Sequence, residues 1–91
     1  MTGAELISQE RERQINEEGF NREHDSQHSV DVLCAAAISY MMYDQPGCDD
    51  VAEENWPWDS EWWKPRDRQK NLIRAGALIA AAIDRLRDGD S

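Results

Sequence analysis

All four tryptophans of this 91-residue chain lie within the eight-residue segment WPWDSEWW at positions 56–63, and Pro65 follows two residues later. A tryptophan side chain buries on the order of 200 Å². A chain of this length forms one domain, residues 1–91, which buries roughly two thirds of its unfolded surface. The four side chains must therefore either supply much of a small core or form a binding surface.

Three helices are predicted, each preceded by a residue type that caps helix N-termini. They run from about residue 4 to 18, from about 29 to 43 and from about 67 to 87. The expected caps are Thr2, Ser29 and Asp67. The sequence thus predicts an all-α fold, a compact three-helix domain with a long ordered tryptophan-rich loop at 44–65 between the second and third helices.

Apolar residues recur at helical spacing in all three segments. The stripe of the first helix is thin, consisting of Leu6, Ile7 and Ile15. The second helix presents Leu33, Ala36, Ala37, Tyr40 and Met41, and the third presents Leu72, Gly76, Ile79, Ile83 and Leu86. A helix with so thin a stripe packs lightly or needs a partner, so the first helix suggests a homodimer.

Alanines are concentrated in the second helix at 35–37 and in the third at 75–82. Faces of such small residues let helices approach closely or leave volume that a close-packed interior must fill. The tryptophan segment is the available filler, so we expect it to be ordered and mostly buried, with one or two tryptophans partly exposed. A ligand or partner surface is the alternative.

Charge is distributed unevenly. Residues 1–63 carry 15 acidic and three basic side chains, and residues 64–91 carry four acidic and seven basic ones, for a net charge of −9. Such an acidic body repels nucleic-acid phosphates and attracts basic surfaces. We expect no direct binding to nucleic acid, and a basic, nucleic-acid-binding host protein as the partner.

Several short motifs occur together in this chain. They are ERERQI at 10–15, EGF at 18–20, EHD at 23–25 with His28, WPW at 56–58, WWKP at 62–65 and NLIRAGALI at 71–79. In this combination, over about residues 10–86, the chain resembles a group of small phage and prophage accessory proteins of unknown function. The resemblance implies a phage context, in which accessory genes often encode modulators of host or defence proteins.

Two surfaces are candidates for binding. The first is a carboxylate-rich face for a protein partner, consisting of Glu10, Glu17, Glu18, Asp49, Asp50, Glu53 and Glu54. The second is an aromatic and basic cluster at the start of the third helix, consisting of Trp62, Trp63, Lys64, Arg66, Arg68, Lys70 and Arg74. In the second cluster tryptophan would stack on a base while cations and the helix N-terminus hold phosphate. The basic residues could instead neutralise the acidic loop.

Catalytic and metal signals are weak. His24 and His28 are four residues apart, the spacing of two ligands on one helix face, but a zinc site needs further ligands that no spacing supplies. Pyrophosphohydrolases of the MazG type need carboxylate pairs three residues apart on facing helices, and outside the first helix only Asp50 and Glu53 have this spacing in residues 1–63. The sequence therefore leans against enzyme activity without excluding it, and we expect no cofactor and no metal.

Cys34 and Cys48 form no ligand cluster, and free thiols are typical of cytosolic proteins. The longest apolar run, 75–83, is too short for a membrane span, and the N-terminus has no signal-peptide pattern. The sequence therefore favours a small acidic phage interaction protein in the cytoplasm of the bacterial host, an inhibitor of the anti-CRISPR or anti-restriction type. A nucleotide or small-molecule sequestrant is the alternative, and a MazG-like enzyme ranks third.

Overall fold

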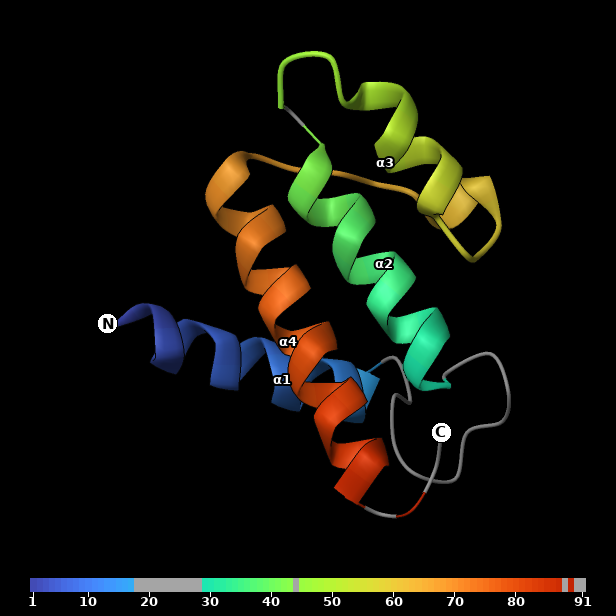
Figure 1. The fold of residues 1–91 in the computed structure, drawn as a ribbon. Coiled ribbons are helices and arrows are strands. Elements are labelled where there is room, and N and C mark those ends of the chain that lie inside the picture. The colour runs from blue at the N-terminus through green and yellow to red at the C-terminus, as the bar shows by residue number, and fades with distance from the viewer. Residues whose placement is uncertain (18–28, 44, 88, 90–91) are drawn as a thin grey trace.

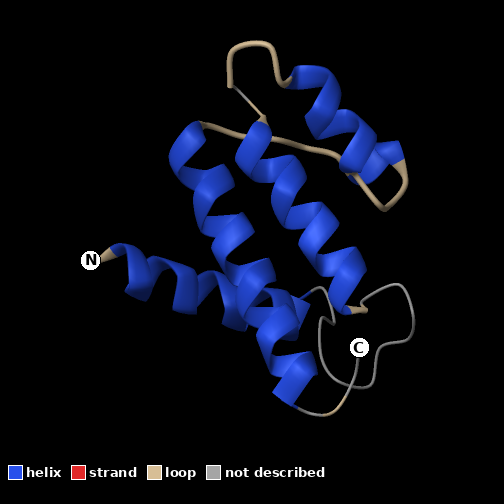
Figure 2. Ribbon diagram, viewed as in Figure 1, coloured by secondary structure: helices blue, strands red, loops and turns tan. Residues whose placement is uncertain are grey.

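The computed structural model describes residues 1–17, 29–43, 45–87 and 89, and these residues are mostly helical (Figure 2). The elements are α1 (Gly3–Glu17), α2 (Val30–Met42), α3 (Asp49–Asn55), the short 3₁₀ helix η2 (Ser60–Trp62) and α4 (Arg68–Arg87). None of the described residues forms a strand. The all-α prediction is therefore confirmed, with one more α-helix than the sequence indicated.

All three predicted N-cap residues cap their helices. In each, a side-chain oxygen accepts a hydrogen bond from the backbone N–H three residues later, at 3.2 Å for Thr2, 3.4 Å for Ser29 and 2.9 Å for Asp67. Thr2 is also one half of a capping box, because its own N–H donates to the Glu5 carboxylate at 2.9 Å. These local interactions fix where the three longer helices begin.

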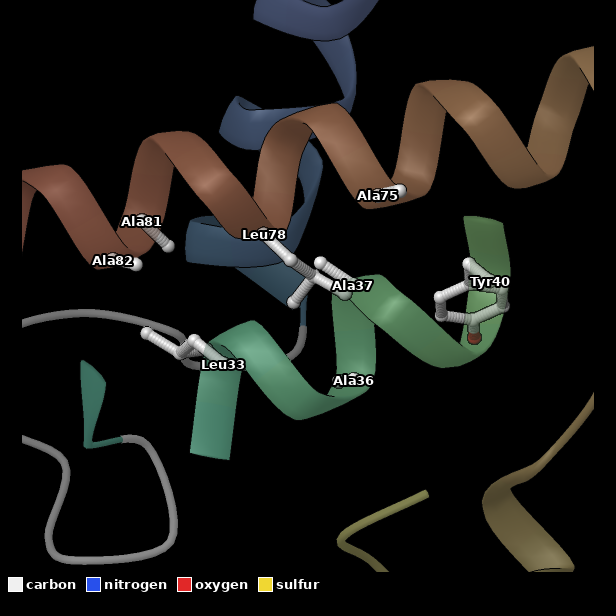
Figure 3. Packing of buried hydrophobic residues seen from close by; sticks show 8 residues of the cluster. All are labelled: Leu33, Ala36, Ala37, Tyr40, Ala75, Leu78, Ala81 and Ala82. Atoms are coloured by element: carbon white, nitrogen blue, oxygen red, sulfur yellow. The ribbon is translucent and has the colours of Figure 1, made fainter. Parts of the chain in front are cut away.

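An antiparallel pair of helices, α2 and α4, forms the centre of the fold, with α1 packed on α4 and α3 packed on α2 (Figure 1). The core between the pair consists largely of small residues: Leu33, Ala36, Ala37, Tyr40, Ala75, Leu78, Ala81 and Ala82. Figure 3 shows the Leu78 side chain pointing from α4 toward Ala37 on α2. The alanines thus serve mainly to let the two helices approach closely.

The buried face of α4 is not the predicted one. We expected Leu72, Ile79, Ile83 and Leu86 to form the core stripe, but they remain 41–57% exposed, whereas the alanine face with Leu78 is buried. Met41 on α2, predicted to be in the core, is also exposed. The physical reason is that both faces of α4 are apolar, and the face of small residues allows the closer helix contact.

Helix α1 crosses α4 at Gly76 (Figure 1). A Cβ atom built on Gly76 would lie 2.5 Å from the Ile7 Cδ1 atom, so the missing side chain makes room for Ile7. Arg11 donates to Asp84 at 3.2 Å and ties the same two helices together. Gln14 is buried on α1, whereas Ile15 of the predicted stripe is 36% exposed.

The segment between α2 and α4 is not the continuous loop that we predicted, because residues 49–55 form α3 and residues 60–62 form η2. Ala52 of α3 is fully buried. An acidic residue at the start of a helix interacts favourably with its dipole, and Asp50 supplies one in the first turn of α3. None of the described helices is both long enough and apolar enough to cross a membrane.

Candidate functional site

Three of the four tryptophans pack at one end of the core, around Tyr40. The ring centroid of Trp56 lies 5.5 Å from that of Tyr40, 4.8 Å from that of Trp63 and 5.1 Å from that of Trp58. Trp63 also lies 5.3 Å from Tyr40. The rings meet edge-on or tilted, the arrangements that aromatic quadrupoles favour. Trp56, Trp58 and Trp63 are half-buried against the core, so their role is structural.

Trp62 is different, because 64% of its surface is exposed. The turn of η2 sends Trp63 into the cluster and leaves Trp62 on the outside. The Trp56 indole N–H donates to the Asp59 carbonyl at 3.0 Å, which fixes the start of this turn against the cluster. Trp62 is therefore an exposed aromatic side chain next to the packed cluster of Trp56, Trp63 and Tyr40.

The linker from η2 to α4 is held by side chains of α4. Buried Asn71 accepts a hydrogen bond from the Arg66 N–H at 2.7 Å and donates to the Arg66 carbonyl at 2.9 Å. Arg74 donates to the Lys64 carbonyl at 3.1 Å, and its guanidinium lies 5.8 Å from the Tyr40 ring centroid. Polar side chains of α4 thus order the backbone that carries the basic residues.

These contacts divide the predicted aromatic and basic cluster into residues with a structural role and residues that are exposed. Trp63 is packed among other rings and Arg74 is half-buried in a structural position. The four remaining cations, Lys64, Arg66, Arg68 and Lys70, are exposed. Of the two tryptophans expected to stack on a base, only Trp62 presents an exposed face.

The predicted carboxylate face divides into two surfaces. Glu10 and Glu17 lie on α1, which packs on α4, whereas Asp50, Glu53 and Glu54 lie on α3, which packs on α2. Figure 1 shows α3 beside the upper part of α2, whereas α1 crosses α4, with Ile7 of α1 meeting Gly76 near the middle of that helix. They therefore do not form one face.

The α1 part of the predicted face offers less free negative charge to a partner. Glu10 is bound by the Arg13 guanidinium through contacts of 2.6 and 2.8 Å, so its charge is already neutralised locally. Glu17 is exposed at the end of α1. Glu18 lies outside the described residues, and Asp49 is described only as the first residue of α3.

The other part belongs to a run of exposed acidic residues along α3 and η2, which we call the α3–η2 surface. It consists of the exposed residues Asp50, Glu53, Glu54, Asp59, Glu61 and Trp62, with Val51 at 36% exposure. The sequence contains no lysine or arginine from residue 23 to residue 63. This surface therefore combines concentrated negative charge with one exposed aromatic ring.

Sequence reasoning did not include Asp59 and Glu61 in the acidic face. Both flank η2, which the sequence analysis treated as part of an aromatic segment. The long interval without a basic residue was the available signal, because it covers α3 and η2 alike.

The positions of the described residues give little support to a metal site or to a MazG-like active site. His24 and His28 lie outside the described residues, and within the described ranges no three His, Cys, Asp or Glu side chains gather as metal ligands would. Asp50 and Glu53 do fall on a helix, but both are exposed, and the neighbouring α2 carries only Asp31 as a carboxylate. The pattern of carboxylates on facing helices is thus not assembled there.

Comparison with known proteins returned no match to any family model, to any curated protein or to any solved structure. The resemblance to phage and prophage accessory proteins stays a prediction from the sequence motifs.

Proposed function

We propose that this protein is an interaction protein that binds a basic protein partner through the α3–η2 surface. The observation that supports this most is Trp62, whose exposed ring lies in a segment with five exposed carboxylates. Interface hot spots are enriched in tryptophan and are commonly surrounded by polar residues that exclude water. Trp62 would insert into the partner while the carboxylates pair with its lysines and arginines.

The charge of the surface favours one class of partner. Exposed carboxylates attract a positively charged protein and speed its association, and they repel nucleic acid itself. A protein that handles nucleic acid carries the required basic surface. Together with the phage-type motifs, this makes an inhibitor of a host defence or nucleic-acid-handling complex, of the anti-CRISPR or anti-restriction type, the function we propose.

The decisive experiment measures protection of phage in bacteria that carry a CRISPR or restriction system and express the protein. Reversing three charges on α3, with Asp50→Lys, Glu53→Lys and Glu54→Lys, should abolish protection. The matched control reverses exposed charges on α1, with Glu12→Lys and Glu17→Lys, and should retain it. Both sets should fold normally, because exposed charges contribute little to stability.

The sequestrant alternative makes the opposite prediction. It requires Lys64, Arg66 and Lys70 together with Trp62, whereas the acidic side chains are dispensable. Neutralising those three cations to glutamine should therefore leave protection intact if the α3–η2 surface binds the partner. Loss of protection in the cation variant alone would overturn the proposal, as would the absence of protection by the parent protein in every defence background.

A further inference from the structure

A second surface lies on the opposite flank of the central helix pair and has a different chemistry. Six large aliphatic side chains of α2 and α4 remain 41–57% exposed. They are Ile38, Met41, Leu72, Ile79, Ile83 and Leu86, which we call the α2/α4 apolar face. They make up six of the ten large hydrophobic side chains that are exposed among the described residues.

The α4 residues of this face form one narrow stripe. At about 100° of rotation per residue, Leu72, Ile79, Ile83 and Leu86 fall within a sector of roughly 60°. The stripe lies about 80° around the helix from the buried Leu78 and Ala82 side, which faces α2. Helix α1 borders the other edge of the stripe, because it covers α4 from Gly76, against which Ile7 packs, to Asp84, which Arg11 contacts.

Ile38 and Met41 extend the stripe onto α2. They lie on the flank of α2 away from Ser39, which is fully buried, and roughly 90° from the side that faces α4. Because α2 and α4 run antiparallel (Figure 1), equal rotations in the same sense bring both sets of side chains to the same side of the pair. Figure 1 shows α1 passing behind α4.

The size of the face fits a protein interface. The six side chains expose roughly 500 Å² of apolar surface, near the upper end of the largest patch on a typical monomer, about 300–600 Å². Two copies packed face to face would bury roughly 1,000 Å² from these side chains alone. With the flanking residues added, this reaches the lower limit of about 1,200 Å² for specific interfaces.

Charges at one end of the face favour a second copy in one orientation. Exposed Arg87 ends α4, and exposed Asp31 lies in the first turn of α2, at the same end of the antiparallel pair. A twofold axis along the helices stacks α4 of each copy on α2 of the other, which brings Arg87 of each copy toward Asp31 of the other, so the ion pair forms twice. A twofold axis perpendicular to the helices would instead stack α4 on α4 and bring Arg68 of each copy toward Arg87 of the other.

From this geometry we infer that the protein forms a homodimer through the α2/α4 apolar face, in which the α2 and α4 pairs of two copies make an antiparallel four-helix bundle. This interface leaves α3 and η2 outside the bundle. Each dimer would therefore present two copies of the acidic surface. The dimer does not rest on the proposed function, because no residue of the α3–η2 surface takes part in it.

The test is sedimentation equilibrium of the full chain over about a hundredfold range of concentration. The parent should approach twice the 10.5 kDa mass of the chain. Ile83→Glu places a charge at the centre of the face and should weaken dimerisation by at least about 30-fold. Val51→Glu is the matched control, because Val51 is also partly exposed but lies on α3, and it should leave the dimer intact.

A charge exchange tests the orientation without touching an apolar side chain. Arg87→Asp and Asp31→Arg should each weaken the dimer about two- to fivefold, and the double variant should restore it. This series also decides the question if Ile83→Glu fails to fold, which circular dichroism would show. A parent that stays monomeric throughout, or a dimer that Val51→Glu disrupts and Ile83→Glu does not, would overturn the inference.

Discussion

The side-chain amide of Asn71 forms two hydrogen bonds with the backbone of one residue, Arg66, accepting from its N–H at 2.7 Å and donating to its carbonyl at 2.9 Å. Asn71 lies in the first turn of α4 and is only 1% exposed. One buried side chain therefore fixes the linker between the tryptophan segment and α4. Its amide supplies both the acceptor and the donor that this backbone requires.

We predict that Asn71→Ala lowers the free energy of unfolding by about 2–3 kcal/mol, because it leaves two backbone groups without partners in a buried site. Asn71→Asp should be at least as harmful at neutral pH, since its carboxylate can accept from the Arg66 N–H but faces the Arg66 carbonyl. Urea unfolding followed by circular dichroism measures both. Gln69→Ala, at an exposed position of the same helix, is the control, and an equal loss there would contradict this explanation.

The contact between Gly76 and Ile7 predicts that the effect of Gly76→Ala on stability changes sign with the residue at position 7. Gly76→Ala gains helix propensity worth about 1 kcal/mol. The new Cβ, however, would lie 2.5 Å from Cδ1 and 2.8 Å from Cγ1 of Ile7, and overpacking costs about 1–3 kcal/mol. We expect Gly76→Ala to destabilise the parent by about 1 kcal/mol net and to displace α1.

In an Ile7→Ala background the obstruction is gone, so the same change at Gly76 should stabilise the protein. Thermal and urea unfolding of the four proteins in this cycle measure the reversal. Gly3→Ala is a matched control, because a Cβ at Gly3 meets no heavy atom within 4 Å, and it should not destabilise. A Gly76→Ala change that has the same sign in both backgrounds would show that α1 does not pack there.

Local sequence signals predicted the helix starts and the buried side of α2. Thr2, Ser29 and Asp67 cap as expected because a cap depends on three or four neighbouring residues. Leu33, Ala36, Ala37 and Tyr40 of the predicted α2 stripe are also buried as expected, whereas Met41 of the same stripe is exposed.

The buried side of α4 could not be predicted in this way. Leu72 and Ile83 follow a regular apolar spacing, as a buried stripe does, yet the core uses Ala75 and Leu78 on an adjacent side. Periodicity identifies an apolar face but does not state what covers it, and α4 has two such faces. The same limit applies to the acidic residues, which sequence reasoning grouped by charge although α1 packs on α4 and α3 packs on α2.

The tryptophans provide a third prediction. Trp56→Ala and Trp63→Ala should each destabilise by about 3 kcal/mol, at the lower end of the range for tryptophan truncation because both rings are half-buried. Trp62→Ala should change stability by less than about 0.5 kcal/mol, since its ring is exposed. Urea titrations at equal protein concentration separate the two classes. Equal losses at all three positions would mean that Trp62 also belongs to the core.

Trp56→Phe refines this test. The substitution keeps an aromatic ring beside Tyr40 and Trp63 but removes the indole N–H that donates to the Asp59 carbonyl at 3.0 Å. We expect a loss between those of Trp62→Ala and Trp56→Ala, of which about 1 kcal/mol comes from the hydrogen bond.

The capping box of α1 predicts a response to pH. The pKa of Glu5 is lowered below its ordinary value of 4.5, first by the hydrogen bond from the Thr2 backbone and second by the Thr2 side chain. A lowered folded-state pKa means that the folded protein holds the proton less tightly than the unfolded chain does. The stabilising contribution of Glu5 is therefore present above pH 4.5 and is lost as pH falls through the lowered value.

A carboxyl titration of Glu5 by NMR should accordingly give a midpoint below 4.5. Thr2→Ala should raise that midpoint only in part, because the backbone donor that contributes most remains. Glu5→Gln should remove the acid-dependent loss of helical signal that arises at the start of α1, whereas Glu12→Gln, at an exposed position in the middle of the helix, should not. A Glu5 midpoint that Thr2→Ala leaves unchanged would show that the hydroxyl takes no part in holding the carboxylate, and that the Thr2 backbone N–H alone lowers its pKa.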